Sequence, residues 1–176
     1  SLDIADADAI ANARTAYEAL DTIGKAWVGA ELAAKLASYE QAQDSAKAVV
    51  DAIATLGDKD DLTDENYTDK TEALTAAEKL YNDFVRLYGE EDSAKLITNA
   101  QALTDYRTAY NAAEEAAKAK AKQAAIQNVE DLIEAIGEVN EDNYTEKEAL
   151  IVAAETALRE LQATYGDVAA NEVRNK

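Results

Sequence analysis

Apolar residues recur at steps of three and four along most of the chain, with polar residues between them. The clearest run lies between Ser93 and Ile136, a segment that contains neither glycine nor proline. Its apolar positions are Ile97, Ala100, Leu103, Tyr106, Tyr110, Ala113, Ala117, Ile126, Val129, Ile133 and Ile136. This spacing follows the period of an α-helix and predicts one apolar stripe along a single long helix. Such a helix would measure roughly 65 Å at 1.5 Å per residue, which is too long for one small bundle.

Glycines divide the rest of the sequence into helix-sized segments. Four of them follow stretches with helical spacing, where a glycine commonly ends a helix: Gly57, Gly89, Gly137 and Gly166. We therefore expect helices to end near Leu56 and Ile136. After polar turns, new helices should start near Asn66 and Asn143 and run to the next glycine. Both asparagines are suitable N-caps, and each is followed three residues later by an acid, which resembles a capping box.

The two helices that start at these asparagines belong to an internal repeat. Aligned without a gap, residues 66–89 and 143–166 are identical at nine of 24 positions. A third, partial copy lies upstream, where ANARTAYEAL (11–20) aligns with TAAEKLYNDF (75–84). Further on, Leu36 and Tyr39 correspond to Leu103 and Tyr106. The same phrases recur because a structural module recurs.

The repeat and the long helix together predict the architecture. We expect an all-α protein of tandem three-helix bundles joined by long shared helices, an elongated array of the spectrin kind. The predicted divisions are a partial first module at 1–44, a complete three-helix module at 45–117, and a third, truncated module at 118–176. The stretch from Ala30 to Leu56 would be the shared helix between the first two modules.

Composition supports helices and removes much catalytic chemistry. The 176 residues include no Pro, Cys, His or Met, and 48% are apolar, many of them alanine. Proline breaks helices, so its absence favours long uninterrupted ones. Without Cys and His there is no thiolate nucleophile, no imidazole base and no Cys or His metal ligand. We expect no enzyme, no catalytic or cofactor-binding residues and no metal site.

The formal net charge is −19, from 36 acidic and 17 basic residues. Nucleic acid and anionic lipid would be repelled by such a surface. No stretch reaches the ~20 apolar residues that a membrane span requires. The first residues show no signal-peptide pattern, and we expect the chain to be a piece of something larger.

Several local features have a functional and a structural interpretation. The acidic loop 58–65 suggests calcium but lacks the EF-hand ligand spacing, so a solvated turn is expected. Asn66 and Asn143 each begin an N-x-[ST] acceptor sequence, which we interpret as helix capping rather than glycosylation. The local basic patch of Lys118, Lys120 and Lys122 could dock an acidic partner, but a helical linker is expected.

Aromatic and paired acidic residues are interpreted as structural as well. Trp27 could be an exposed binding residue. Four tyrosines fall at helical core spacing and are expected to pack: Tyr17, Tyr81, Tyr106 and Tyr110. The pairs Glu90-Glu91 and Glu114-Glu115 have no partner pattern that indicates acid–base catalysis.

The sequence also resembles a known family. ARTAYEALDTIGKAWV (13–28), KLITNAQALTDYRTAY (95–110) and VEDLIEAIGEVNEDNY (129–144), with VVDAIATLG (49–57), are similar to helical repeat modules of Gram-positive bacteria, including those of FIVAR type. Such modules occur in cell-wall-anchored adhesins and large secreted glycosidases. Gly29 and Ala30 stand where the family pattern has an asparagine. The pattern has an apolar residue at the position of Trp27, so the resemblance implies that this side chain fills a bundle core.

The resemblance implies a noncatalytic structural or adhesion repeat at the bacterial cell surface or in a secreted protein. It would act as a stalk or spacer that presents other domains. Two alternatives remain: a module that binds a host or bacterial surface protein or glycan, and an accessory module of a large secreted carbohydrate-active enzyme. Neighbouring modules of the same chain are expected partners, and neither nucleic acid nor membrane insertion is.

Overall fold

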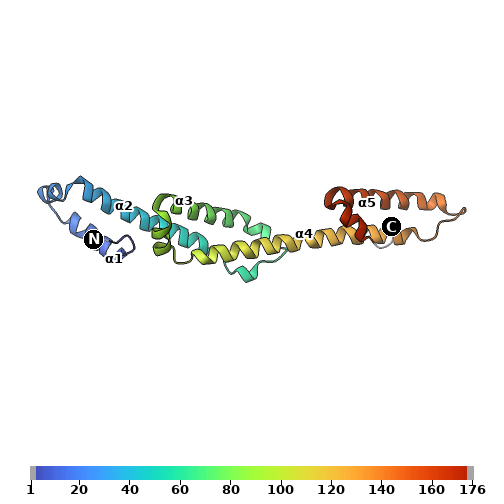
Figure 1. The fold of residues 1–176 in the computed structure, drawn as a ribbon, viewed down its shortest axis with the longest axis horizontal. Helices are drawn as coiled ribbons and strands as arrows, with labels where there is room; N and C mark the ends of the chain where they lie inside the picture. The colour runs from blue at the N-terminus through green and yellow to red at the C-terminus, as the bar shows by residue number, and fades with distance from the viewer. Residues whose placement is uncertain (1–2, 174–176) are drawn as a thin grey trace. The chain divides into compact units, whose positions relative to one another are not determined.

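A computed structural model describes residues 3–173, and these form helices, turns and loops without any β-strand. The predicted all-α class is confirmed (Figure 1). The elements in chain order are α1 (Ala7–Glu18), α2 (Thr22–Ala54), the 3-10 helices η1 (Lys59–Asp61) and η2 (Tyr67–Lys70), α3 (Thr71–Leu96), α4 (Ala100–Ile136) and α5 (Tyr144–Glu172).

The chain divides into two compact units. Unit 1 comprises Ser1–Asn111 and unit 2 comprises Ala112–Lys176. The long helix α4 contributes residues to both, because it runs without a break from Ala100 to Ile136. The predicted long helix therefore exists, although it begins seven residues after Ser93. The finer division into modules at 1–44, 45–117 and 118–176 stays a prediction.

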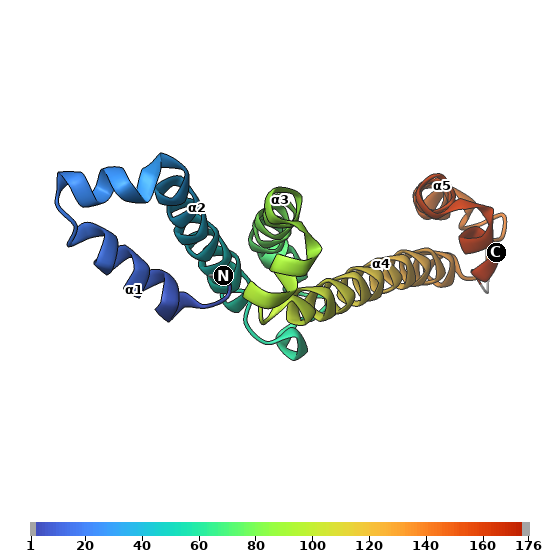
Figure 2. The same cartoon turned by 60° about the vertical axis from the view of Figure 1, so that its left-hand side comes forward.

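Unit 1 is organised around one apolar core. α2, α3 and the first part of α4 each supply one apolar face to it. Figure 2 shows α3 beside the end of α2 and the start of α4. α1 contacts α2. The buried members are Ala46, Val49, Ile53, Leu56, Leu74, Ala77, Phe84, Ile97, Leu103, Tyr106 and Tyr110. Their spacing on each helix follows the three-and-four pattern of the sequence, so hydrophobic burial is the main force that assembles the unit.

Unit 2 is smaller and has a core of its own. The second part of α4 and α5 face each other across the loop 137–143, with Ile126 and Val129 on α4 and Leu161 on α5 fully buried. Ala169 and Val173, which follow the bend in α5, complete this core. The described part of unit 2 thus consists of two long helical segments and a short returning one.

The helices predicted to end at Gly89 and Gly166 bend there and then continue. Gly89 has φ 84° and ψ 167°, Gly166 has φ 82° and ψ 176°, and Gly29 in α2 has φ 80° and ψ 155°. This region of backbone space is essentially restricted to glycine. The regular helix does stop at each glycine, but short helical segments follow Gly89 and Gly166, and the longer second part of α2 follows Gly29. The sequence argument missed them because it treated glycine only as a terminator.

We expect Gly89→Ala to lower the free energy of unfolding by about 1–3 kcal/mol, the usual cost of holding a side chain in this backbone region. A Cβ at Gly89 would have no neighbouring atom within 4 Å, so the cost would come from backbone strain alone. Denaturant unfolding followed by circular dichroism measures it. The control is Glu90→Ala at the exposed next residue, which should be nearly neutral. Equal effects of the two substitutions would contradict the assigned conformation.

The capping role predicted for Asn66 and Asn143 is wrong. Neither side chain bonds to the first turn of the following helix. Instead, each asparagine Oδ1 accepts a hydrogen bond from the backbone N–H three residues earlier, of Thr63 and Asn140, at 2.8 Å in both copies. Each Nδ2 donates to the backbone carbonyl five residues earlier, at 2.9 Å and 3.1 Å. The asparagines therefore brace the preceding loop.

Candidate interaction surface

The acidic loop 58–65 is organised by its own side chains. The Asp58 carboxylate accepts from the backbone N–H of Asp60 at 2.9 Å and caps η1. Lys59 pairs with Asp60, and this hydrogen bond raises the pKa of the Lys59 ammonium. Within residues 3–173 no group of three or more acids is placed to hold a metal ion. The loop is a capped turn in which charges are compensated locally.

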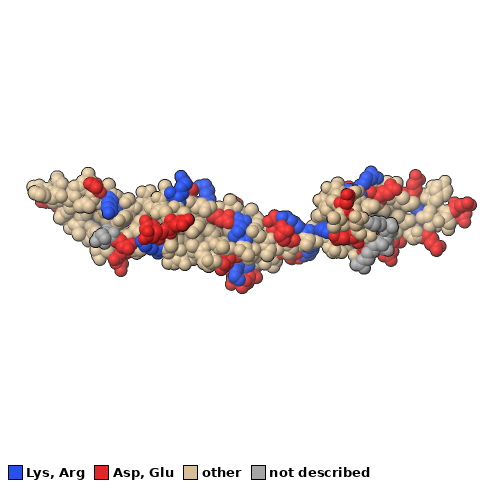
Figure 3. All heavy atoms as spheres, viewed as in Figure 1, with Lys and Arg blue, Asp and Glu red and all other residues tan. Residues whose placement is uncertain are grey.

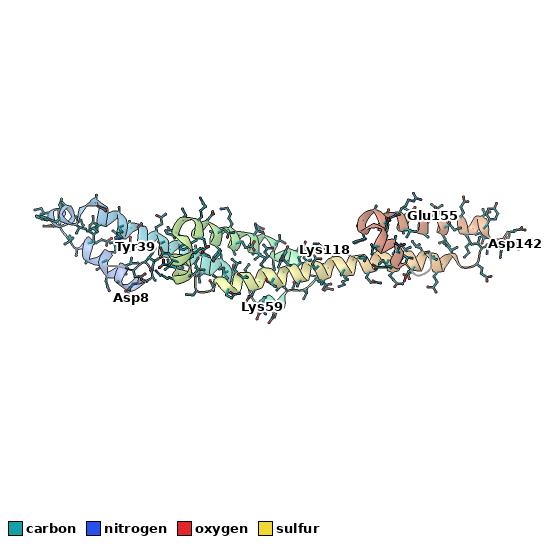
Figure 4. All side chains as sticks on the ribbon, in the orientation of Figure 1. Asp8, Tyr39, Lys59, Lys118, Asp142 and Glu155 are labelled. Atoms are coloured by element: carbon teal, nitrogen blue, oxygen red, sulfur yellow. The ribbon has the colours of Figure 1, made fainter. Side chains whose placement is uncertain are left out.

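The basic patch on α4 is likewise compensated. Lys118 lies 3.0 Å from Glu114 and 2.9 Å from Glu115, and the hydrogen bonds to these two carboxylates raise its pKa (Figure 4). Lys122 lies 2.6 Å from Glu172 at the end of α5. The acid pair Glu114-Glu115 and the basic patch thus neutralise each other in part, which fits a helical segment better than a docking site.

Trp27 is not in a core, so the structural interpretation of this residue is wrong. It is 85% exposed, on the first part of α2 before the bend at Gly29. Ile23 and Leu32 on the same part of the molecule are also exposed. Figure 3 shows that this end of unit 1 carries few charged side chains on the visible face. Burial of Trp27 would require a further element packed against α2, which the sequence pattern alone could not reveal.

The tyrosines predicted to pack divide into two groups. Tyr106 and Tyr110 are buried in the core of unit 1, and Tyr81 packs against that core. Burial raises the pKa of Tyr106, with a smaller contribution from the charge of Asp61. Tyr17 is only partly buried and lines an open groove. The packing prediction is confirmed for the first three residues and differs for the fourth.

The groove that Tyr17 lines runs between α1 and α2 and has a volume of about 540 Å³. Its lining is almost wholly apolar: Ala13, Tyr17 and Leu20 come from α1 and its end, and Leu32, Leu36 and Tyr39 come from α2. Figure 4 shows Tyr39 on α2 beside α1. Lys35 is the one charged residue among those that line it. An apolar concavity of this kind is a typical binding surface.

Residues that line the groove correspond, in the alignment of the repeats, to core residues of unit 1. By the alignment of the repeats, Ala13, Leu36 and Tyr39 correspond to Ala77, Leu103 and Tyr106, which are all buried core residues. Leu20 corresponds to Phe84, yet Leu20 is 37% exposed and Phe84 only 2%. The two exposed fractions differ because the second part of α2 packs over Phe84 and the other core residues of the second repeat. Among the described residues, no helix takes that place in the first repeat.

Two ion pairs occupy equivalent positions with opposite polarity. Arg14 on α1 makes two hydrogen bonds to the Glu40 carboxylate on α2, with the Nε–Oε1 distance at 2.7 Å. In the second repeat Glu78 on α3 stands where Arg14 stands, and it receives the same paired hydrogen bonds from Arg107 on α4. The Arg14 hydrogen bond lowers the pKa of Glu40, so the pair contributes stability above the ordinary pKa of a glutamate and loses it as the pH falls.

We expect Arg14→Glu to lower the melting temperature of the chain by a few degrees, because it replaces an attractive ion pair by two negative charges at facing positions. The double variant Arg14→Glu with Glu40→Arg should recover most of the loss, since it installs the polarity that the second repeat already uses. Thermal unfolding of the three proteins at low salt makes the comparison. A double variant as unstable as the single one would show that the pair has no favourable coupling.

Comparison of the chain with protein-family models, with curated proteins and with solved structures returned no match. None of the helices in residues 3–173 has the length and apolar character needed to span a membrane. The interpretation of the site therefore depends on the geometry described above and on the internal repeat.

Proposed function

We propose that this chain is a noncatalytic structural repeat of a bacterial cell-surface or secreted protein, which acts as a stalk or spacer and presents other domains. In this proposal the repeats are three-helix bundles joined by shared helices, in an elongated array of the spectrin kind. Adhesion through the helical faces is part of the same proposal. The resemblance of residues 13–28 and 95–110 to modules of Gram-positive surface proteins supports the location.

The observation that carries the proposal is the double role of α4. Leu103, Tyr106 and Tyr110 in its first part belong to the core of unit 1, whereas Ile126 and Val129 in its second part belong to the core of unit 2. A helix that serves two cores lets each repeat contact only its neighbours, so copies can be added without changing the rest. A spacer needs this property because its length is its function.

The chemistry of the described side chains also agrees with a noncatalytic role. Reactive chemistry in a chain without His and Cys would need carboxylates or lysines in a pocket that shifts their pKa values. The acid pairs singled out in the sequence are instead engaged on helix surfaces: Glu91 lies 2.9 Å from Lys95, and Glu114 and Glu115 pair with Lys118.

The test is to lengthen the chain by one repeat. A second copy of residues 76–152, inserted after Val152, preserves the 77-residue period and should give a folded protein. Its longest dimension in small-angle X-ray scattering should increase by tens of ångströms, on the scale of α4, whose 37 residues measure about 55 Å at 1.5 Å per residue. An inserted chain that stays folded but becomes rounder, with no longer dimension, would contradict the spacer proposal.

A matched control separates the repeat from mere extra length. A second copy of residues 76–150, inserted after Leu150, is two residues shorter than the period. It turns the helix faces on the two sides of the junction by about 200° relative to each other, because each residue advances a helix by about 100°. This variant should expose apolar surface and unfold at lower denaturant concentration. If both insertions behave alike, the repeat period has no structural role.

The open groove favours the second candidate function, a module that binds another polypeptide. Such a module would use the apolar surface between α1 and α2.

A further inference from the structure

The groove between α1 and α2 lacks the cover that its counterpart has. In unit 1, the core positions on α3 and α4 are covered by the second part of α2, which presents Ala46, Val49 and Ile53, with Leu56 directly after it. These four residues stand at positions i, i+3, i+7 and i+10. Residues of the same type line the groove at aligned positions; Leu36 among them is buried, whereas Leu20 and Leu32 are exposed. The second repeat therefore shows what kind of element fits the first.

We propose that the groove is a docking site for an amphipathic α-helix with this i, i+3, i+7, i+10 apolar spacing, supplied by a neighbouring repeat. The proposal builds on the repeat array proposed above. The chain carries a second helix of this type in residues 122–137, where Ile126, Val129, Ile133 and Ile136 have the same spacing. The spacing is thus a property of the repeat, and the groove is the surface that recognises it.

Charge favours a helix with acidic flanks. Lys35 lines the groove with its ammonium 5.6 Å from the centre of the Tyr39 ring. Lys25 lies 5.8 Å from the centre of the Tyr17 ring. At the position of Lys35 the second repeat has Ala102, so this cation is particular to the groove. A helix such as residues 122–137, with Glu130, Asp131 and Glu134 beside its apolar positions, is complementary to that rim.

Exposed apolar side chains lie in the groove and beside it, where Trp27 is 85% exposed. Leu32, which lines it, is 60% exposed, and Val28 beside Trp27 lines it as well. A docked helix would remove this apolar surface from water, which favours docking. Trp27 would then serve as a local reporter, because it is the only tryptophan in the sequence.

The experiment attaches a helix of this type at the N-terminal side of α1, at the position that the alignment of the repeats gives for it. A second copy of residues 122–142 is joined directly ahead of residue 2, because the alignment of the repeats pairs position 143 with position 2. The tether is needed since an isolated helix of this length is marginal in water. The control extension carries Val129→Asp and Ile133→Asp within the added copy only. Both chains are compared with the parent by amide hydrogen exchange and by sedimentation.

Docking should slow exchange of the α1 amides by about tenfold or more relative to the control extension, and it should shift the Trp27 fluorescence. Leu32→Asp in the extended chain should remove the gain, while the same substitution in the parent should leave its stability unchanged because Leu32 is exposed. Equal exchange in the two extended chains would overturn the proposal. Protection that appears only in a dimer would assign the groove to a second copy and overturn it too.

This outcome is separable from that of the proposed function. The insertion of residues 76–152 tests whether repeats add length, and it leaves the groove untouched. An extended chain with an unprotected α1 would reject the docking site and keep the spacer. Protection of α1 with no gain in length on insertion would reject the spacer and keep the docking site.

Discussion

Phe84→Ala is expected to lower the free energy of unfolding of unit 1 by about 3–5 kcal/mol, the usual cost of removing a buried aromatic side chain. Phe84 is fully buried in the core, and its ring centre lies 4.6 Å from that of Tyr88. The substitution would leave a cavity between α2, α3 and α4, because the surrounding helices are fixed by many other contacts and can close only in part.

The repeat offers a matched control. Leu20 aligns with Phe84 but lies at the edge of the open groove, so Leu20→Ala should cost less than about 1 kcal/mol. Urea unfolding followed by circular dichroism, with amide exchange to assign the change to unit 1, measures both variants. Similar losses at the two positions would mean that the first repeat is covered as the second one is, which would contradict the open groove.

Leu161→Asp is expected to unfold unit 2. Leu161 is 2% exposed and lies in the core of this unit with Ile126 and Val129. Burying an unpaired carboxylate there costs several kcal/mol. That cost is comparable with the whole stability of a unit of this size, at roughly 0.05–0.15 kcal/mol per residue.

Amide exchange gives the readout for unit 2. Residues 144–172 should lose protection, while core amides of unit 1, such as those around Leu74, should keep theirs. The control is Val152→Asp, on the same helix at an exposed position, which should change little. If Leu161→Asp also removed protection from the core of unit 1, the two units would not unfold independently.

The helical class and most element positions follow from the sequence because they depend on local chemistry. A chain without proline, with apolar residues at steps of three and four, has few alternatives to α-helix. The long helix α4 was predictable for the same reason. Its start at Ala100 was not, because the bend at Gly89 and the short segment after it depend on how that segment packs, with Ile97 buried in the core.

The predictions made from the sequence are wrong at two kinds of position: where two local interactions compete, and where burial of a side chain depends on an element distant in the sequence. Asn66 has the chemistry of an N-cap, but the loop before it offers the Thr63 N–H and the Asp61 carbonyl at better geometry. The family resemblance implied a core position for Trp27, but nothing in its own segment indicates whether another helix covers it. The groove escaped prediction for that reason.

The ion pairs Arg14–Glu40 and Glu78–Arg107 could have been found in the sequence. Aligning Ala13-Arg14 with Ala77-Glu78 shows opposite charges at one position, and Tyr39-Glu40 against Tyr106-Arg107 shows the reverse at another. Two opposite changes at positions one helix apart indicate that the residues are in contact. The signal lies in the alignment of the chain with itself.

The opposite polarity of these pairs has a consequence for how a repetitive chain folds. Helices that resemble one another can exchange partners while the chain is being synthesised, and each wrong pairing buries similar apolar residues. Here, α1 against α4 would bring Arg14 to Arg107. In the same way, α3 against the part of α2 that natively contacts α1 would bring Glu78 to Glu40. Like charges repel in both mismatches. The two ion pairs therefore favour the native pairing among helices whose apolar faces are too similar to select it.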